Sequence, residues 1–194
     1  MRSLTALLLL TGSCIAHSVC AEGLNPPPSS AFGGYQAYEL KPLAISDELK
    51  GSETGLKATA KIQENIDARL KPIIAEWTQK STGQGNGSTL VIEPSVNDLR
   101  FINGAKRFFA GALAGSSHVV MKVRIVEQPG DKVIAEPEFY QHASGMAGAW
   151  TVGAHDNTML NRVVDLAANY LSANFDGAVG GPSGREELEK EKKK

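Results

Sequence analysis

The chain is poor in cysteine, in aromatic residues and in net charge. Both cysteines, Cys14 and Cys20, lie among the first 20 of its 194 residues, so no disulfide can form within the remainder. Aromatic residues make up only 6%, and the core must therefore be built mostly from Val, Ile, Leu and Ala. A formal charge of −1 excludes a general attraction to nucleic acid or acidic lipid. No run after residue 21 is long and apolar enough to span a membrane as a helix.

The first 21 residues have the pattern of an export signal. Residues 1–2 carry a positive charge and residues 4–15 form an apolar run. Residues 19–21 place small side chains at the two positions that a signal peptidase inspects. We predict that residues 1–21 are a signal peptide, that cleavage follows Ala21, and that the exported protein is periplasmic.

The same stretch also contains a sequence close to a bacterial lipobox. In that pattern a cysteine after small residues is lipidated and becomes the first residue, and Cys14 follows Gly12 and Ser13. Thr11 stands where the pattern has leucine, and the apolar run before Cys14 would be short. Lipidation of Cys14 is the alternative to cleavage after Ala21, and it would make the protein an outer-membrane lipoprotein.

Composition divides the rest of the chain into three parts. Residues 22–34 are rich in Pro, Ser and Gly, which favours an extended tether that holds the domain away from its attachment. Residues 35–176 have the size of one domain. Residues 177–194 are expected to form a Gly-rich linker followed by a charged, mobile tail.

Two amphipathic helices are predicted from the spacing of apolar residues. The first runs from a cap at Ser52 or Thr54 to about Lys80. Pro72 lies inside this pattern and should kink or divide the helix, because proline lacks a backbone donor. The second helix is expected over residues 156–175, with its first residue as the cap.

Strands are predicted over residues 35–45, over residues 89–99 with an interruption near Pro94, and in a hairpin of residues 118–127 and 132–141. The residues of the hairpin expected to face inward are Val119, Met121, Val123, Ile125, Val133, Ala135 and Phe139. The elements together predict an α+β fold. We expect an antiparallel or mixed sheet of about four strands with the two amphipathic helices packed on one face.

No convergent catalytic or metal-binding pattern is found. The histidines after the signal lack the short spacing of metal ligands; they are His118, His142 and His155. Ser117 and His118 should point to opposite faces of a strand and so are badly placed to share a proton. Glu136 and Glu138 share one strand face about 7 Å apart, but we expect that face to be exposed. We therefore predict no catalytic residue, no metal site and no cofactor.

A Gly/Ala-rich segment over residues 101–117 is the strongest candidate for an interaction. It is interpreted as a tightly packed loop or short helix over the sheet. The alternative is a self-association or membrane-dipping element with Lys106 and Arg107 at the lipid headgroups. A similar small-residue stretch ends at Trp150. The predicted interaction residues are Phe108, Phe109, Gly111, Gly115 and Trp150.

The order of these segments resembles a family of bacterial exported proteins, often lipoproteins, known only as a domain of unknown function. The resemblance rests on residues 90–94, 110–117, 119–126 and 130–136, and it covers roughly residues 35–175. It implies an α+β domain of the Gram-negative envelope. The chain is also distantly similar to the periplasmic domains of outer-membrane assembly lipoproteins, such as the curli secretion channel subunit. The family has no established site, so no functional residue carries over.

These observations lead to a hypothesis of an exported, non-enzymatic envelope protein that binds an envelope protein partner or associates with itself. The alternatives are a periplasmic hydrolase and a subunit of an outer-membrane pore or secretion assembly. No nucleic acid is expected as a partner. Contact with a membrane is expected only through a lipid on Cys14 or through residues 101–117.

Overall fold

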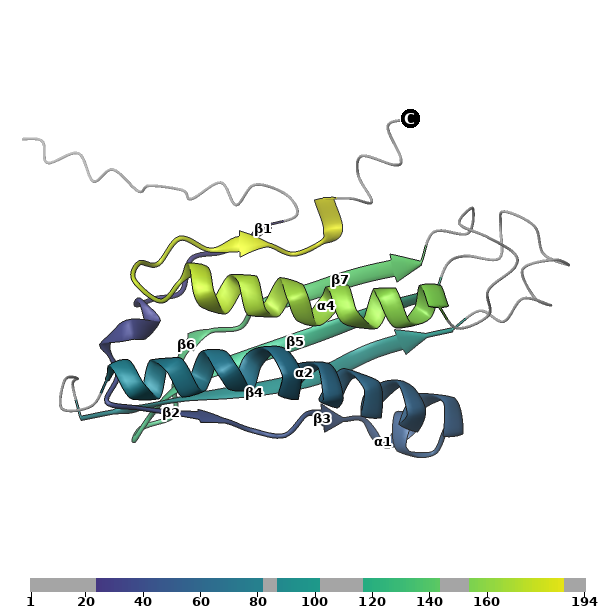
Figure 1. Cartoon of the computed structure of the whole chain (residues 1–194), viewed down its shortest axis with the longest axis horizontal. Helices are drawn as coiled ribbons and strands as arrows, with labels where there is room; N and C mark the ends of the chain where they lie inside the picture. The colour runs from purple at the N-terminus through teal and green to yellow at the C-terminus, as the bar shows by residue number, and fades with distance from the viewer. Residues whose placement is uncertain (1–23, 82–86, 102–116, 144–153, 187–194) are drawn as a thin grey trace, which may run out of the picture.

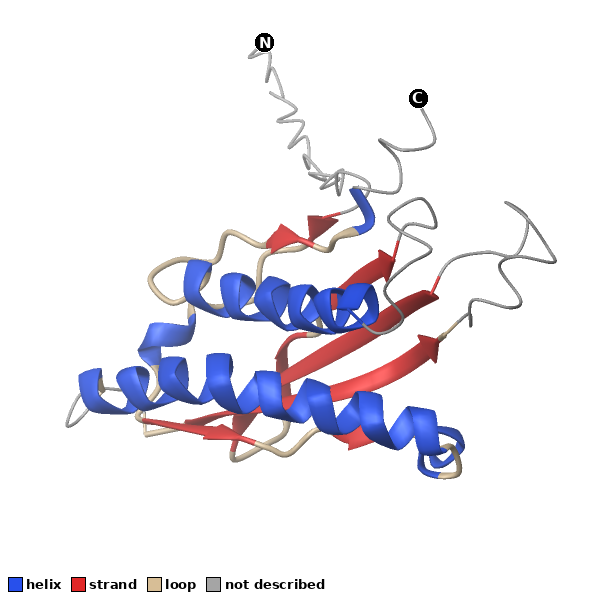
Figure 2. Ribbon diagram, turned by 45° about the vertical axis from the view of Figure 1, so that its right-hand side comes forward, coloured by secondary structure: helices blue, strands red, loops and turns tan. Residues whose placement is uncertain are grey.

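The structure is a computed structural model that describes residues 24–81, 87–101, 117–143 and 154–186. A twisted mixed sheet forms one layer, and the helices α2 and α4 lie side by side over one of its faces (Figures 1 and 2). The elements are β1 (Leu24–Asn25), the 3-10 turn η1 (Phe32–Gly34), β2 (Ala37–Leu40), β3 (Ala44–Ile45), α1 (Asp47–Lys50), α2 (Glu53–Lys80), β4 (Thr89–Arg100), β5 (Ser117–Gln128), β6 (Lys132–Ala135), β7 (Glu138–Ala143), α4 (Ala154–Ala173) and β8 (Gly181–Pro182).

The main sheet has six strands in the described residues, not about four as predicted. β4 and β5 are its long central strands, and they run antiparallel. β2 and β3 follow one another along the outer side of β4, both parallel to it, while β6 and β7 follow one another along the outer side of β5. The sheet is therefore mixed, as one of the two alternatives predicted.

The larger strand number arises because two predicted strands are each divided by a proline. Pro42 lies between β2 and β3, and Pro137 lies between β6 and β7. Proline cannot donate to a strand ladder, so pairing stops at these positions. The Pro137 carbonyl still accepts a hydrogen bond from the Val123 amide at 3.0 Å, which keeps the chain beside β5.

The long helix α2 follows its prediction except at the proline. The Ser52 side chain accepts a hydrogen bond from the Gly55 amide at 3.2 Å, and the helix ends at Lys80. The predicted division at Pro72 is wrong, because α2 is a single helix through this position. Both Pro72 and Ala68, whose carbonyl loses its helical donor, are exposed, and water can bond that carbonyl.

The strand irregularities also differ from their predicted positions. Pro94 pairs in register with Val123, and the shift in β4 falls between Val96 and Asp98. On β6 the prediction that Val133 faces inward is wrong: Val133 is 43% exposed, whereas Ile134 is 3% exposed. A register shift opposite β5 accommodates one extra residue here, and such a bulge turns the neighbouring side chain inward.

The core lies between the sheet and the two helices. The prediction for β5 is confirmed, because Val119, Met121, Val123 and Ile125 are all at most 1% exposed. The apolar stripe of α4 is also confirmed, although the helix begins at Ala154 rather than at Asp156. The fully buried residues that face the sheet from the helices include Ile62, Ile66, Leu70, Val163, Val164 and Ala167. Within the described ranges no helix has the length and apolarity needed to cross a membrane.

The two segments expected to be a tether and a linker are packed onto the domain. β1 pairs antiparallel with β8, so the ends of the described chain lie together beside β7 (Figure 1). Phe32 is fully buried, and its amide donates to the Asn174 carbonyl at 2.9 Å. Residues 24–34 therefore do not form a free-standing spacer, and the linker over residues 177–186 is held by strand pairing.

Candidate functional site

A polar surface covers the face of the sheet opposite α2 and α4, and no helix of the described ranges lies over it. Strand register shows which residues belong to this surface, because residues paired across strands lie on the same face of a sheet. We call it the polar face and define it by Glu93, Asp98, Arg100, His118, Lys122, Arg124, Glu136, Glu138, Tyr140 and His142. It carries side chains of both charge signs.

The middle of the polar face is a ladder of ion pairs across the strands. Arg124 of β5 lies between two carboxylates: its Nη1 is 2.8 Å from Glu93 Oε2, and its Nε is 3.8 Å from Glu136 Oε1. Lys122 lies one row further along β5, directly opposite Glu138 of β7. A positive column on β5 is thus flanked by negative columns. Because these side chains are partly exposed, each pair contributes little to stability, about 0–1 kcal/mol.

Three buried valines lie beneath these charges. Val91, Val120 and Val126 are 4%, 9% and 1% exposed, and register places them on the polar face rather than in the core. Long charged side chains can cover apolar residues with their aliphatic stems while their charged ends stay in water. The polar face therefore has an apolar base of three valines, and little water reaches these valines.

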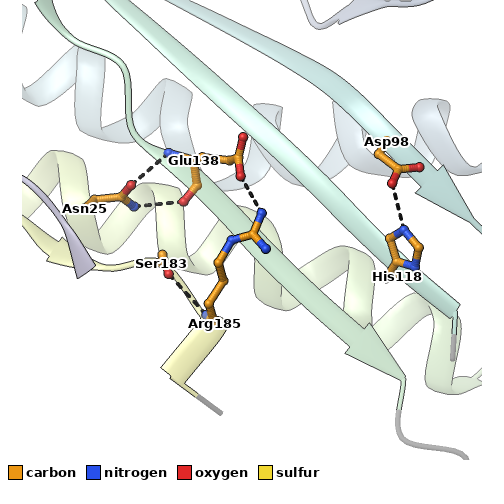
Figure 3. A network of polar contacts seen from close by, with 6 residues as sticks. All are labelled: Asn25, Asp98, His118, Glu138, Ser183 and Arg185. Carbon is orange, nitrogen blue, oxygen red and sulfur yellow. Dashed lines mark hydrogen bonds and ion pairs between the residues drawn. The ribbon is translucent and has the colours of Figure 1, made fainter. Parts of the chain in front are cut away.

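One end of the polar face carries a row of rings. His118 Nε2 is 2.8 Å from Asp98 Oδ2, which joins β5 to β4 (Figure 3). The Tyr140 ring is stacked with the rings of His118 and His142, at centroid distances of 6.0 and 5.9 Å. Rings from β5 and β7 thus form one continuous strip.

The C-terminal residues reach the edge of this strip. Arg185 Nη2 is 2.6 Å from Glu138 Oε1 (Figure 3). The Arg185 guanidinium also lies 5.2 Å from the centre of the Tyr140 ring. Such a cation over an aromatic face contributes about 0.5–1 kcal/mol at an exposed site. Tyr and Arg are the residues most often found at the centres of protein–protein interfaces.

The structure locates the two residue pairs that the sequence offered for catalysis. Ser117 is fully buried, whereas the His118 side chain is 20% exposed on the opposite face, so the two do not form a nucleophile and base. Glu136 and Glu138 each face a different guanidinium, and both side chains are partly exposed. No group of three His, Cys, Asp or Glu side chains in the described ranges could hold a metal ion.

The predicted interaction residues Phe108, Phe109, Gly111, Gly115 and Trp150 lie outside the described residues, as does Cys14. The side chain of His155 also lies outside the described part. The strand ends that flank their segments can still be located. β4 ends at Arg100, and Arg100, His118 and His142 pair in one row across β4, β5 and β7. β4 and β7 therefore both end at the end of the sheet that carries the ring strip.

Sequence reasoning missed Asp98, Tyr140, Asn25 and Arg185. Asp98 comes beside His118 only because of the register shift between Val96 and Asp98, which no local pattern indicated. Asn25 and Arg185 belong to segments interpreted as tether and tail. A signal was present for Tyr140, because an aromatic residue next to alternating polar residues on a hairpin strand is typical of a partly exposed face.

Comparisons with known proteins assign no family to the chain. No family model matches it, and no curated protein matches it. Among solved structures, the PelC dodecamer from Paraburkholderia phytofirmans is similar at 12% identity over 71% of this chain and 90% of that chain, with a TM-score of 0.36. A Xanthomonas campestris protein of family model DUF330 has 8% identity over 77% and 91%, with a TM-score of 0.38.

A putative lipoprotein from Caulobacter crescentus has 14% identity over 73% of this chain and 89% of that chain, with a TM-score of 0.32. Similarity at this level transfers neither a partner nor an activity to this chain. The resemblance to outer-membrane assembly lipoproteins stays a prediction.

Proposed function

We propose that this chain is an exported, non-enzymatic protein of the cell envelope that binds another protein through its polar face. The observation that carries the proposal is a sheet face that no described helix covers and that combines alternating charges, a Tyr–His strip and buried valines. A face that carries both signs of charge disfavours nucleic acid and an acidic lipid surface, which select for positive charge. A protein surface can match both signs, and it gains further from the rings at one end.

The location rests on the export signal over residues 1–21, with a lipid on Cys14 as the alternative form of attachment. The predicted interaction segments add support, because residues 102–116 and 144–153 continue from the strand ends at the ring strip. Mutation of Phe108, Phe109 or Trp150 would distinguish two roles of these residues. Weaker partner binding at unchanged stability would indicate a role in binding, and lower stability would indicate a role in folding. The pore alternative depends on residues 101–117 and is tested by conductance of liposomes that contain the purified protein.

The experiment that tests the proposal is site-specific photo-crosslinking in the native host. A benzoylphenylalanine replaces Lys122 at the centre of the polar face, and Lys57 on α2 serves as the matched control, since its side chain is 77% exposed. We expect a discrete crosslinked protein from position 122 only. Purified partner and purified chain should then bind, and Arg124→Glu should weaken binding at least tenfold, about 1.4 kcal/mol. The thermal midpoint should fall only modestly, because the new carboxylate lies beside Glu93 and Glu136 at a partly exposed site.

Equal crosslinking from both positions, or none from position 122, would remove the polar face as the binding surface. A periplasmic hydrolase is the second candidate, and it is favoured only by the His118–Asp98 pair. Turnover of any substrate that is abolished by His118→Ala and retained by Arg124→Glu would replace the binding proposal with the enzymatic one.

A further inference from the structure

The outer edge of β7 is occupied by the two ends of the described chain. The Asn25 side chain acts there as a neighbouring strand would: its Nδ2 donates to the Glu138 carbonyl at 2.9 Å, and its Oδ1 accepts from the Glu138 amide at 2.9 Å (Figure 3). The Tyr140 amide donates to the Ser183 carbonyl at 2.7 Å. An edge strand with free backbone groups is a template for another chain, and here these groups are paired internally.

The contacts along this edge select a specific short sequence, Ser183-Gly184-Arg185. A Cβ on Gly184 would lie 2.1 Å from the Tyr140 carbonyl oxygen and 2.8 Å from Leu166 Cδ1, and its φ of +86° is strained for other residues. The next residue, Arg185, adds an ion pair with the Glu138 carboxylate at 2.6 Å. The edge therefore has the properties of a peptide-binding site: a backbone ladder, a position restricted to glycine, and a charge-assisted contact.

The residues that connect α4 to this segment are exposed, whereas the residues at the two ends of the connection are buried. Asn174 is fully buried at the end of α4, and Gly180 is buried at the start of the segment. Between them Asp176 and Ala178 are exposed. The Val179 side chain is 65% exposed, but the Val179 amide donates to Asn174 Oδ1 at 2.8 Å and so belongs to the anchored end. A short exposed connection between two anchored points is where a chain can open and pass its terminal segment to a neighbour.

We propose that the β7 edge is a strand-binding site for the Ser183-Gly184-Arg185 segment, and that a second copy of this chain supplies this segment in trans. A second copy fits this site, because its Ser183-Gly184-Arg185 segment would make the same contacts with β7 that the segment makes within one chain. The site lies on the sheet edge, so the inference goes beyond binding through the polar face.

A disulfide trap tests the exchange. Leu24 and Pro182 are direct partners in the β1–β8 pair. Full-length chain with Cys14 and Cys20 replaced by Ser is made as two variants, Leu24→Cys and Pro182→Cys, which are mixed, unfolded, refolded together and oxidised. Exchange gives a covalent heterodimer, whereas a segment that stays within its own chain gives none. Leu24→Cys mixed with Lys57→Cys measures random collision.

Two substitutions show whether the trapped dimer uses the proposed contacts. Gly184→Ala in both partners should abolish the heterodimer, whereas Gly87→Ala should retain it. Gly87 is a matched control, because its φ of +82° is similar but a Cβ there meets nothing within 4 Å. If Gly184→Ala fails to fold, Arg185→Ala, which removes only the ion pair and ring contact, should reduce the yield instead.

A heterodimer yield equal to the Lys57→Cys background would overturn the proposal, and so would a yield unchanged by both Gly184→Ala and Arg185→Ala. Either outcome leaves the crosslinking test of the polar face unaffected, so failure of one proposal is distinguishable from failure of the other.

Discussion

Asn174→Ala should be one of the most destabilising single substitutions outside the apolar core. The Asn174 side chain is fully buried and makes four hydrogen bonds to backbone groups. Its Nδ2 donates to the Tyr170 and Gly180 carbonyls at 2.7 and 3.1 Å, and its Oδ1 accepts from the Val179 and Gly180 amides, both at 2.8 Å. This one side chain turns the end of α4 back toward the β7 edge.

The magnitude follows from the groups that the substitution leaves unpaired. Each hydrogen bond contributes a net of about 1 kcal/mol, and a buried polar group without a partner costs about 1–3 kcal/mol. Alanine orphans the buried Gly180 amide and carbonyl, but neighbouring bonds are not additive. We expect a loss of about 3 kcal/mol in the free energy of unfolding, which is a large part of the roughly 5–15 kcal/mol of a typical domain.

Urea unfolding followed by circular dichroism measures this loss. With a slope of about 2 kcal/mol per molar urea, the midpoint should fall by about 1.5 M. Asn169→Ala is the matched control on the same helix, because Asn169 is exposed. It should stabilise slightly, by about 0.5 kcal/mol, through higher helix propensity. A loss under about 1 kcal/mol for Asn174→Ala would refute the reasoning, since water would then be satisfying the orphaned groups.

Three further predictions concern titration, an ion pair and the core. Burial raises the pKa of Tyr170 to about 12. The protonated phenol therefore contributes its full stabilisation below the unfolded pKa of 10, and this contribution is lost as pH rises toward 12. Tyr170→Phe should show a shallower fall in urea midpoint between pH 10 and 12 than the unsubstituted protein, and an equal fall would contradict the assignment. Arg69 bonds Asp165 between α2 and α4 and also donates to the side-chain oxygen of the buried Asn65 at 3.2 Å. Arg69→Ala should therefore cost about 1–2 kcal/mol, of which only the ion-pair part should fall at high salt. Ile66 is fully buried, and Ile66→Ala should cost about 3 kcal/mol, whereas Leu56→Ala at a 46% exposed position of α2 should change the midpoint little.

Much of the fold could be predicted because its signals are local. The Ser52 cap and the helical spacing that follows define α2, and the alternation of Val119, Met121, Val123 and Ile125 defines the buried face of β5. The predicted strand count is too low because the segments on the two sides of Pro42, and those on the two sides of Pro137, each read as one strand. A proline stops strand pairing only where its missing amide would have to donate to a neighbouring strand, and the sequence alone does not show which strand lies beside it.

Much less of the candidate site could be predicted from the sequence. His118 was recognised as a residue of interest, but its partner Asp98 lies on another strand, and a register shift between Val96 and Asp98 sets their contact. Composition around residues 22–34 indicated a tether, yet burial of Phe32 holds that segment on the domain. Proline-rich composition describes what a free chain prefers, and a single buried aromatic residue can outweigh it.

The sequence by itself determined the fold class, the two amphipathic helices, the inner face of β5 and the absence of disulfides after residue 21. Each depends on residues close together in the chain, where spacing and backbone preference act directly. Only the tertiary structure decided the strand register, the polar face and the closure of the β7 edge by Asn25 and Ser183. Those features join residues far apart in the chain, such as Asn25 and Glu138, and packing of the whole domain sets their geometry.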